Sequence, residues 1–262
     1  VVSIEDRGFQ FGDGVYEVIR TYRGQPFAIE EHLARLERSA QALQLSIGQT
    51  RAQWSSLIRE GLRLSQFPEA KIYLQITRGQ APRDHPFPVS SAPTTVLTFR
   101  ELHPLDVSVR NAGVQAMSVE DIRWGRCDIK SVNLLANVLA RQRAKEAGVF
   151  EAILVREGTV TEGSVSNVMV VRNGAVQTAP EGRRILSGVT RAIVLDLARK
   201  EGIPVAESFV TREELLAASE VFLTGTTVEV LPVVRVDGHM IGGGSPGPVS
   251  QLLSRRFEAL VG

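Results

Sequence analysis

Segments with the two-residue period of a β-strand and segments with a helical period follow one another along this chain. In the first part, strands are expected at 14–22, 26–29, 71–77 and 94–100, and helices at 31–45 and 51–64. Residues 78–91 contain several prolines and glycines and are expected to form a loop. Such a mixture favours an α+β fold over an all-helical or all-strand one.

The second part repeats the mixture. A strand is expected at 113–119, a helix at 131–147 closed by Gly148, and a helix at 189–200. Hairpins are expected to turn at Glu157-Gly158 and at Asn173-Gly174, a capping box begins at Thr211, and strands follow at 221–223 and 233–236. We therefore expect a small α/β domain over 1–101, a connector over 102–112 and a larger C-terminal domain over 113–262 that carries Lys130.

Composition excludes several classes of protein. The chain has 30 Lys and Arg against 29 Asp and Glu, and no basic stripe interleaved with aromatics, so nucleic acid is not expected as a partner. Its apolar runs are too short for a membrane span, and four histidines with one cysteine argue against a metal site. The single cysteine fits a cytoplasmic protein. Because the chain opens at Val1 rather than Met, we expect part of its N-terminus to be missing.

Lys130 is one of only four lysines and lies where a strand-like step meets the start of an expected helix. Ser131 could cap that helix, so the lysine would have a short, defined reach. An apolar surround disfavours the charged ammonium, and a neutral amine can condense with an aldehyde. A lysine extended over the surface is the simpler interpretation of this residue alone.

Glu162 stands where a strand ends among small residues, in the run Val160-Thr161-Glu162-Gly163-Ser164. A carboxylate bonded to a pyridine nitrogen keeps that nitrogen protonated, so the ring can accept electrons. Together with a Schiff-base lysine this indicates a pyridoxal phosphate site. An exposed loop glutamate is the alternative.

Three elements are suited to a phosphate. Gly188-Val189-Thr190 opens a helix whose first N–H groups lack partners, and Thr224-Gly225-Thr226-Thr227 follows an apolar strand with further hydroxyls. Arg35, on the first helix, could add a charge-assisted contact. Each is also compatible with an ordinary helix start, turn or solvated helix face.

A possible trap for a substrate carboxylate lies in the 78–91 loop. Arg83 and His85 are two residues apart there, and Tyr16 lies on the first strand. Arginine with histidine or tyrosine donors suits a carboxylate, although a polar turn exposed to water would have the same composition.

Several of these motifs resemble, in order and spacing, those of the class IV (fold-type IV) pyridoxal phosphate enzymes. The likeness covers essentially the whole chain and is carried by Arg7–Glu17, Glu31–Leu36, Asp121–Leu135, Thr161–Ser164 and Gly188–Arg191. The Lys130 run and the Arg83-Asp84-His85 sequence resemble most the D-amino acid aminotransferases. The threonines at 224–227 are closer to the branched-chain branch, since D-specific relatives tend to carry serines there.

The resemblance implies a two-domain fold-type IV structure and a role for each candidate residue. Lys130 would form the Schiff base with pyridoxal 5'-phosphate and move the proton between Cα and C4′, and Glu162 would pair with the ring nitrogen. Leu186 would pack on one ring face. The phosphate would be held by Arg35, Val189, Thr190 and Thr226. The substrate carboxylate would be bound by Tyr16, Arg83 and His85, the last two supplied by the second subunit of a homodimer.

The implied reaction is ping-pong transamination between D-amino acids and 2-oxo acids. Branched-chain L-amino acid aminotransferases and aminodeoxychorismate lyases share the cofactor residues and remain alternatives. A non-catalytic binding protein with the same fold is an alternative from another class. The run Gly242-Gly243-Gly244-Ser245 lacks the Lys and Ser/Thr of a phosphate-binding P-loop and indicates a turn.

Overall fold

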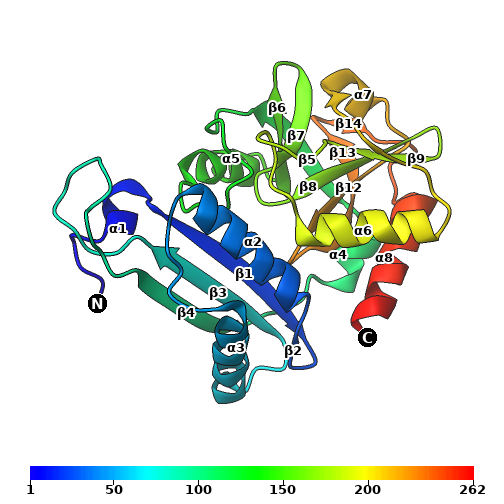
Figure 1. Cartoon of the computed structure of the whole chain (residues 1–262). Helices are drawn as coiled ribbons and strands as arrows, with labels where there is room; N and C mark the ends of the chain where they lie inside the picture. Colours follow the sequence, from blue (N-terminus) through cyan, green and yellow to red (C-terminus); the bar gives the residue numbers. More distant parts are fainter. The chain divides into compact units, whose positions relative to one another are not determined.

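The computed structural model describes all 262 residues, and contacts between Cα atoms divide them into two compact units (Figure 1). The first unit comprises residues 1–103 and 129–134, and the second comprises 104–128 and 135–262. The two-domain α+β organisation expected from the sequence is therefore confirmed. The short segment that carries Lys130 groups with the first unit, although the sequence predicted it within the larger C-terminal domain.

The first unit is a four-stranded antiparallel sheet with two long helices. The strands are β1 (Gly14–Tyr22), β2 (Gln25–Pro26), β3 (Ala70–Thr77) and β4 (Thr94–Glu101), in the order β2-β1-β3-β4. The helices are α1 (Arg7–Phe11), α2 (Ile29–Ala42) and α3 (Arg51–Ser65). Thr50 begins α3 with a capping box, accepting a bond from the N–H of Gln53.

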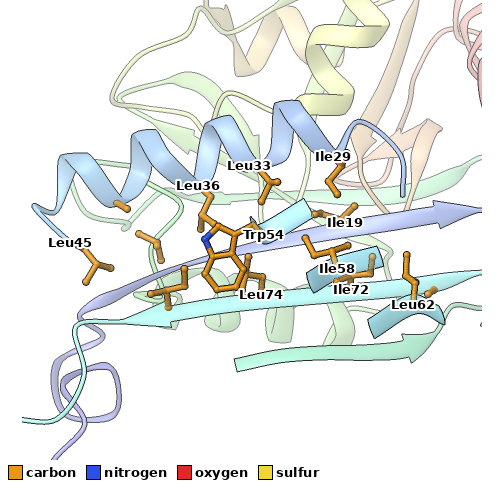
Figure 2. Packing of buried hydrophobic residues seen from close by; sticks show 14 of the residues in the cluster. Ile19, Ile29, Leu33, Leu36, Leu45, Trp54, Ile58, Leu62, Ile72 and Leu74 are labelled. Atoms are coloured by element: carbon orange, nitrogen blue, oxygen red, sulfur yellow. The ribbon is translucent and has the colours of Figure 1, made fainter. Parts of the chain in front are cut away.

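One apolar core joins the sheet of the first unit to its helices (Figure 2). Ile19, Ile72 and Leu74 alternate inward from the strands, and the helical period turns Leu33 and Leu36 of α2 toward them. From α3 come Trp54, Ile58 and Leu62. The predicted strand and helix periods thus converge on one buried cluster.

The second unit is built on a ten-stranded mixed sheet. Its strands are β5 (Val114–Glu120), β6 (Glu151–Arg156), β7 (Thr159–Gly163), β8 (Asn167–Arg172), β9 (Ala175–Thr178), β10 (Val205–Glu207), β11 (Val210–Thr211), β12 (Glu220–Gly225), β13 (Glu229–Val236) and β14 (His239–Met240). They run in the order β10-β9-β8-β12-β13-β5-β6-β7-β11, and β14 pairs with β13. β5 pairs in parallel with β6 and β13.

Five helices complete the second unit. They are α4 (Val107–Ala112), α5 (Leu135–Glu146), α6 (Val189–Lys200), α7 (Arg212–Leu216) and α8 (Pro248–Val261). Helices α6 and α8 lie beside one another against the sheet (Figure 1). None of the helices in either unit has the length and apolar character needed to cross a bilayer.

The local turn signals are confirmed. Glu157 and Gly158 have φ values of 51° and 75°, and Asn173 and Gly174 have 50° and 76°. Two consecutive positive φ angles are what a two-residue hairpin turn matching the strand twist requires. The capping box at Thr211 is also present, and α6 has the predicted bounds.

Four expectations differ from the structure. The strand predicted at 26–29 is only the two-residue β2 (Gln25–Pro26), and Ile29 already begins α2. The helix predicted from Ser131 begins at Leu135, because residues 130–132 are extended and bonded to β1. Ser131 is therefore a strand-bridge residue rather than a helix cap. The predicted connector contains the short helix α4, which Asp106 caps by accepting from the N–H of Ser108. Helix α8, with Pro248 in its first turn, is not among the predicted elements.

We expect Leu36→Ala to lower the free energy of unfolding by about 2–5 kcal/mol, because it leaves a cavity between α2 and β1. Leu36 is fully buried, whereas Leu57 on α3 is 46% exposed and provides the control. Leu57→Ala should stay within about 0.5 kcal/mol of the parent. Urea unfolding of both variants measures this, and equal losses would contradict the assignment of the core.

Candidate active site

The backbone around Lys130 is fixed by strand β1 and helix α2 of the same unit. The carbonyl oxygen of Lys130 accepts from the N–H of Tyr16 at 3.0 Å, and the N–H of Val132 donates to the carbonyl of Gly14 at 3.1 Å. The Lys130 N–H donates to the hydroxyl of Ser39 at 3.1 Å. Bonds on both sides of Lys130 therefore define where its side chain starts.

The Lys130 side chain lies over an aromatic ring. Its Nζ is 4.3 Å from the centroid of the Tyr16 ring, and that ring is 5.6 Å from the ring of Tyr73. Lys130 as a whole residue is only partly exposed. The structure thus brings together the predicted Schiff-base lysine and one of the three predicted carboxylate-binding residues.

Arg35 forms a buried ion pair with Glu17. Its Nε donates to Oε1 of Glu17 at 2.7 Å and its Nη2 to Oε2 at 2.8 Å. The Nδ1 of His32 contacts the same carboxylate at 2.8 Å. Burial alone would raise the pKa of the Glu17 carboxyl, but Arg35 and His32 hold it far below its usual value. The predicted phosphate role of Arg35 stays a prediction, and the structure adds Glu17 as its anchor.

His32 is a neutral member of this cluster. Burial lowers its pKa, and the positive charges of Arg35 and Lys130 act in the same direction, although Glu17 opposes them. Glu17 accepts the bond, so the proton lies on Nδ1 in this arrangement. The two charged groups of this cluster are therefore Glu17 and Arg35, and His32 adds a hydrogen bond to the Glu17 carboxylate.

Arg83 and His85 lie on an exposed loop and share one aromatic neighbour. The guanidinium carbon of Arg83 is 5.0 Å from the centroid of the Phe11 ring, and the His85 ring is 5.4 Å from it. Arg83 forms no ion pair with an acidic side chain of this protein, and its role in carboxylate binding stays a prediction. The sequence predicted the pair but not the ring that holds its two members together.

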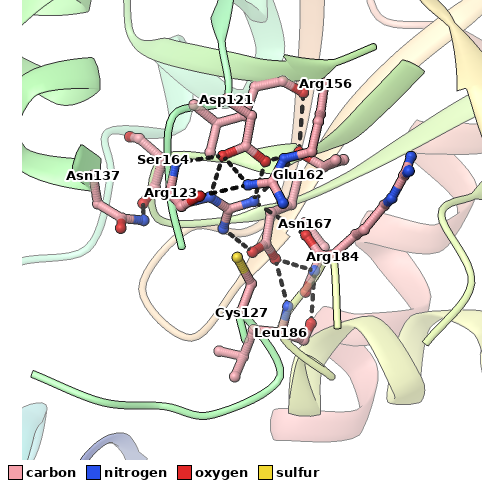
Figure 3. A network of polar contacts seen from close by, with 12 residues as sticks. Asp121, Arg123, Cys127, Asn137, Arg156, Glu162, Ser164, Asn167, Arg184 and Leu186 are labelled. Carbon is pink, nitrogen blue, oxygen red and sulfur yellow. Dashed lines mark hydrogen bonds and ion pairs between the residues drawn. The ribbon is translucent and has the colours of Figure 1, made fainter. Parts of the chain in front are cut away.

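In the second unit, Glu162 is buried at the end of β7 and bonded through both oxygens (Figure 3). Oε2 accepts from Nδ2 of Asn167 and from the N–H of Leu186, each at 3.0 Å. Oε1 accepts a very close contact from Nη1 of Arg123. These donors fix the direction of the carboxylate that the sequence predicts to meet a ring nitrogen.

Arg123 links Glu162 to a second buried carboxylate, Asp121. Its Nε and Nη2 donate to Asp121 at 2.9 and 2.8 Å. Arg156 lies 3.0 Å from the same carboxylate and the Thr161 hydroxyl donates to it at 2.9 Å. Burial would raise the pKa of Asp121, but these bonds, chiefly those from Arg123, lower it to about 2. Asp121 therefore remains charged and holds Arg123 in place.

The turn after Glu162 is held by another buried acid. Glu151 accepts a close contact from the hydroxyl of Ser164 and a bond of 2.9 Å from that of Ser166. The N–H of Gly163 donates to the carbonyl of Ser166 at 2.7 Å. The small residues of this motif thus fold back between β7 and β8.

Asn167 lies at the centre of the predicted cofactor residues of this unit. Besides its bond to Glu162, its Nδ2 donates to the carbonyl of Leu186 at 3.0 Å, and it pairs with Thr224 across β8 and β12. A Cβ at Gly188 would lie 2.0 Å from Asn167 Oδ1, so only glycine fits there. The side-chain amide of Asn167 therefore contacts Glu162 and Leu186 and lies against the start of α6.

The same region offers donors for an anion. No side chain caps α6, so its first N–H groups, at Val189 and Thr190, point outward along the helix axis. The hydroxyl of Thr224 is buried and has no hydrogen-bond partner in the protein. Thr226, the predicted ligand, is partly exposed in the turn after β12. A carboxylate, an uncapped helix start and an orphaned hydroxyl fit a ligand that carries a ring nitrogen and a phosphate.

The model of the family described as amino-transferase class IV matches residues 14–236. This chain belongs to the class IV aminotransferases. Members of this family use pyridoxal phosphate, which agrees with the fit of the residues around Asn167.

Relatives with assigned names are similar over nearly the whole chain. A D-alanine aminotransferase of Bacillus licheniformis is 47% identical over 251 residues, covering 95% of this chain and 88% of its own length. A D-alanine aminotransferase of Staphylococcus haemolyticus is 43% identical over 260 residues, covering 99% and 92%.

Solved structures share the fold as well. A branched-chain amino acid aminotransferase of Escherichia coli has a TM-score of 0.93 at 28% identity, covering 100% of this chain and 90% of its own. A second branched-chain enzyme, from T.th. and with pyridoxamine 5'-phosphate, has a TM-score of 0.91 at 30% identity, covering 100% and 89%. The fold-type IV architecture predicted from the sequence is confirmed.

Sequence reasoning missed Arg123 and Asn167 as residues of this aminotransferase site. Arg123 lies in the Asp121–Leu135 motif, and Asn167 follows the Glu162 motif by three residues, so signals for both exist. Arg123 follows Asp121 by two residues, a spacing that suits an ion pair, and Asn167 is the one polar residue that opens the apolar strand β8. Their contacts with Glu162 join positions that are 39 and 5 residues apart.

We expect Asp121→Asn to lower the free energy of unfolding by roughly 2 kcal/mol near neutral pH, since the pKa of the folded carboxyl is about 2 instead of 3.8. A carboxyl whose pKa is lower in the folded than in the unfolded state stabilises the folded state at pH values above its unfolded pKa. This stabilisation is lost as the pH falls toward the pKa of the folded state. The difference between parent and variant should therefore shrink below about pH 4 in urea titrations.

Asp128→Asn provides the control for this measurement, because Asp128 pairs with Arg126 on the surface and its side chain is 30% exposed. That variant should lose no more than about 1 kcal/mol. A difference for Asp121→Asn that stays constant across pH would show that the ion pairs of Asp121 do not stabilise the fold.

Proposed function

We propose that this class IV aminotransferase transfers amino groups between D-amino acids and 2-oxo acids, with D-alanine and 2-oxoglutarate as a representative pair. The observation that carries the proposal is the buried Glu162 carboxylate, fixed beside an uncapped helix start and the unpartnered Thr224 hydroxyl. D-alanine aminotransferases that are 43–47% identical over 95–99% of the chain support the choice of substrate.

When bound, pyridoxal phosphate supplies an aldehyde that joins amino groups and a protonated ring that accepts electron density from the substrate Cα. Glu162 would pair with the ring nitrogen and so favour its protonated form, and Arg123 holds the Glu162 carboxylate in its direction. Lys130 holds the aldehyde until substrate arrives. The Lys130 amine would also be the base that accepts the proton of the substrate Cα and gives it back during the transfer.

The remaining cofactor residues bind and orient. We assign the phosphate to Arg35, the N–H of Val189, Thr190 and Thr226, and one face of the ring to Leu186. The orphaned hydroxyl of Thr224 supports a further phosphate contact from the same strand end. Fixed donors of this kind cost no reorganisation during the reaction.

Tyr16, Arg83 and His85 bind the α-carboxylate of the substrate in this proposal. The contact of Tyr16 with Lys130 supports a carboxylate site close to the proton-transfer group. We propose a homodimer in which Arg83 and His85 reach the site of the second copy. The orientation of the carboxylate decides which Cα hydrogen faces Lys130 and so selects the D enantiomer.

We also propose a cytoplasmic location, which the single buried cysteine supports.

A branched-chain L-amino acid aminotransferase is the second candidate. The similar solved structures described above are branched-chain enzymes, and Thr224-Gly225-Thr226-Thr227 favours that branch. Greater sequence identity to the D-alanine enzymes makes it the weaker of the two.

Lys130→Ala should abolish transamination and remove the visible absorbance that marks the cofactor bound through lysine, because no other amine is positioned for that bond. The protein has only three other lysines, Lys71, Lys145 and Lys200. Lys145→Ala, on the outer side of α5, serves as the control and should keep both signals. Survival of the absorbance band in Lys130→Ala would refute the assignment.

Paired enantiomers distinguish the two candidate functions. We expect D-alanine to convert the bound cofactor to its amine form at least about a hundredfold more efficiently than L-alanine or L-leucine, since the choice depends on which hydrogen meets Lys130. Rapid-mixing absorbance with each donor gives the comparison. Preference for L-leucine would establish the branched-chain activity instead.

A further inference from the structure

Arg7 is buried at the start of α1 and binds the backbone of the loop that carries Arg83 and His85. Its Nη1 donates to the carbonyl of Asp84 at 2.6 Å and its Nη2 to the carbonyl of His85 at 3.2 Å. Only 3% of Arg7 is exposed. One guanidinium thus holds the two consecutive peptide groups that follow Arg83.

Phe11, one helical turn after Arg7, contacts the side chains of the same loop. Arg7, Arg83 and His85 lie 4.8, 5.0 and 5.4 Å from its ring centroid. Residues four apart on a helix share a face, so α1 presents the guanidinium and the ring to the loop together. Backbone and side chains of the loop therefore rest on one short helix.

Helix α1 is itself anchored. The carboxylate of Asp6 accepts from the N–H of Gly8 at 2.8 Å and from the hydroxyl of Thr77 on β3 at 3.0 Å. A Cβ at Gly8 would lie 2.1 Å from the Thr77 methyl, so α1 approaches the strand as closely as glycine allows. The helix that supports the loop is tied to the sheet of its own unit.

Asp13 completes the support by pairing with two arginines. It accepts from Nε of Arg7 at 2.9 Å and from Nε and Nη2 of Arg78 at 2.7 and 3.0 Å. Burial would raise the pKa of Asp13, but both guanidiniums lower it. The bond from Nε of Arg7 to Asp13 fixes the plane of the guanidinium and with it the direction of the two donors toward the loop.

We propose that Arg7 is a positioning residue for recognition of the substrate carboxylate, acting through the Asp84 and His85 carbonyls on Arg83 and His85. This inference rests on the carboxylate role proposed for those two side chains. Residues 82–87 are all exposed, and besides the ring contacts of Phe11 and of Arg78 over Phe87, the two bonds from Arg7 hold their backbone. Without them the loop would have to be ordered each time substrate binds.

The Arg7→Lys variant tests the hydrogen bonds of Arg7 to the loop separately from its charge. A lysine keeps the charge opposite Asp13, but it is a point donor that cannot bind two carbonyls in the planar fork that arginine uses. Arg78→Lys is the matched control. Arg78 is also buried and pairs with Asp13, but the carbonyls it binds belong to Leu43 and Gln44, although it also lies over Phe87.

The experiment uses the cofactor-loaded enzyme and propionate as a probe that carries only the carboxylate. In Arg7→Lys, the inhibition constant of propionate and the KM for D-alanine should rise about tenfold, as expected for loss of a charge-assisted hydrogen bond that orders the loop. The kcat and the dissociation constant of pyridoxal phosphate should change by less than about twofold, since Arg7 contacts neither Lys130 nor Glu162.

Arg83→Gln and the Arg7→Lys/Arg83→Gln double variant separate the possible failures. If Arg7 acts through Arg83, its substitution should add little in the Arg83→Gln background. Weaker propionate binding in Arg83→Gln with no change in Arg7→Lys would overturn the positioning role and leave the proposed function standing. Unchanged propionate binding in Arg83→Gln would overturn the carboxylate role and this inference with it. Equal effects of Arg7→Lys and Arg78→Lys would overturn the inference alone.

Discussion

A buried carboxylate keeps its charge only where hydrogen-bond donors or a cation replace the water it has lost, and an arginine supplies both. This constraint organises the chemistry of both units. Asp121 and Glu162 share Arg123, Glu17 is paired with Arg35, and Asp13 lies between two guanidiniums. Arginine suits this role because its planar fork fixes direction as well as charge. The orientation of the Glu162 carboxylate thus depends on its ion pair with Arg123, which is in turn held by Asp121, and not on strand β7 alone.

Local signals in the sequence predicted local structure well. The turns at 157–158 and 173–174, the capping box at Thr211 and the bounds of α6 depend on a few adjacent residues, and all are present. The predicted start of the helix after Lys130 was wrong by four residues, because Ser131 pairs with Val15 of β1. That contact is non-local, so neither helix period nor capping preference could reveal it.

The candidate site shows the same division. Glu162, Val189 and Thr190 were predicted from motifs and Leu186 from the family resemblance alone, whereas the contacts of Arg123 and Asn167 are visible only in the folded unit. Tyr16 and Lys130 were predicted separately, and the structure places them in contact. Spacing in the sequence identifies residue types suited to a chemistry, but the hydrogen bonds that direct them form between distant segments.

The chain passes between its two units three times, after residues 103, 128 and 134, since the six residues around Lys130 interrupt the second unit. A cut at the apparent connector would consequently not release two autonomous modules. The N-terminal fragment would lack the partner that bonds to Gly14 and Tyr16 of β1, and the C-terminal fragment would carry the reactive lysine without the strand that orders it. Because residues 129–134 belong to the first unit, the backbone position of Lys130, the candidate Schiff-base residue, depends on the folding of that unit.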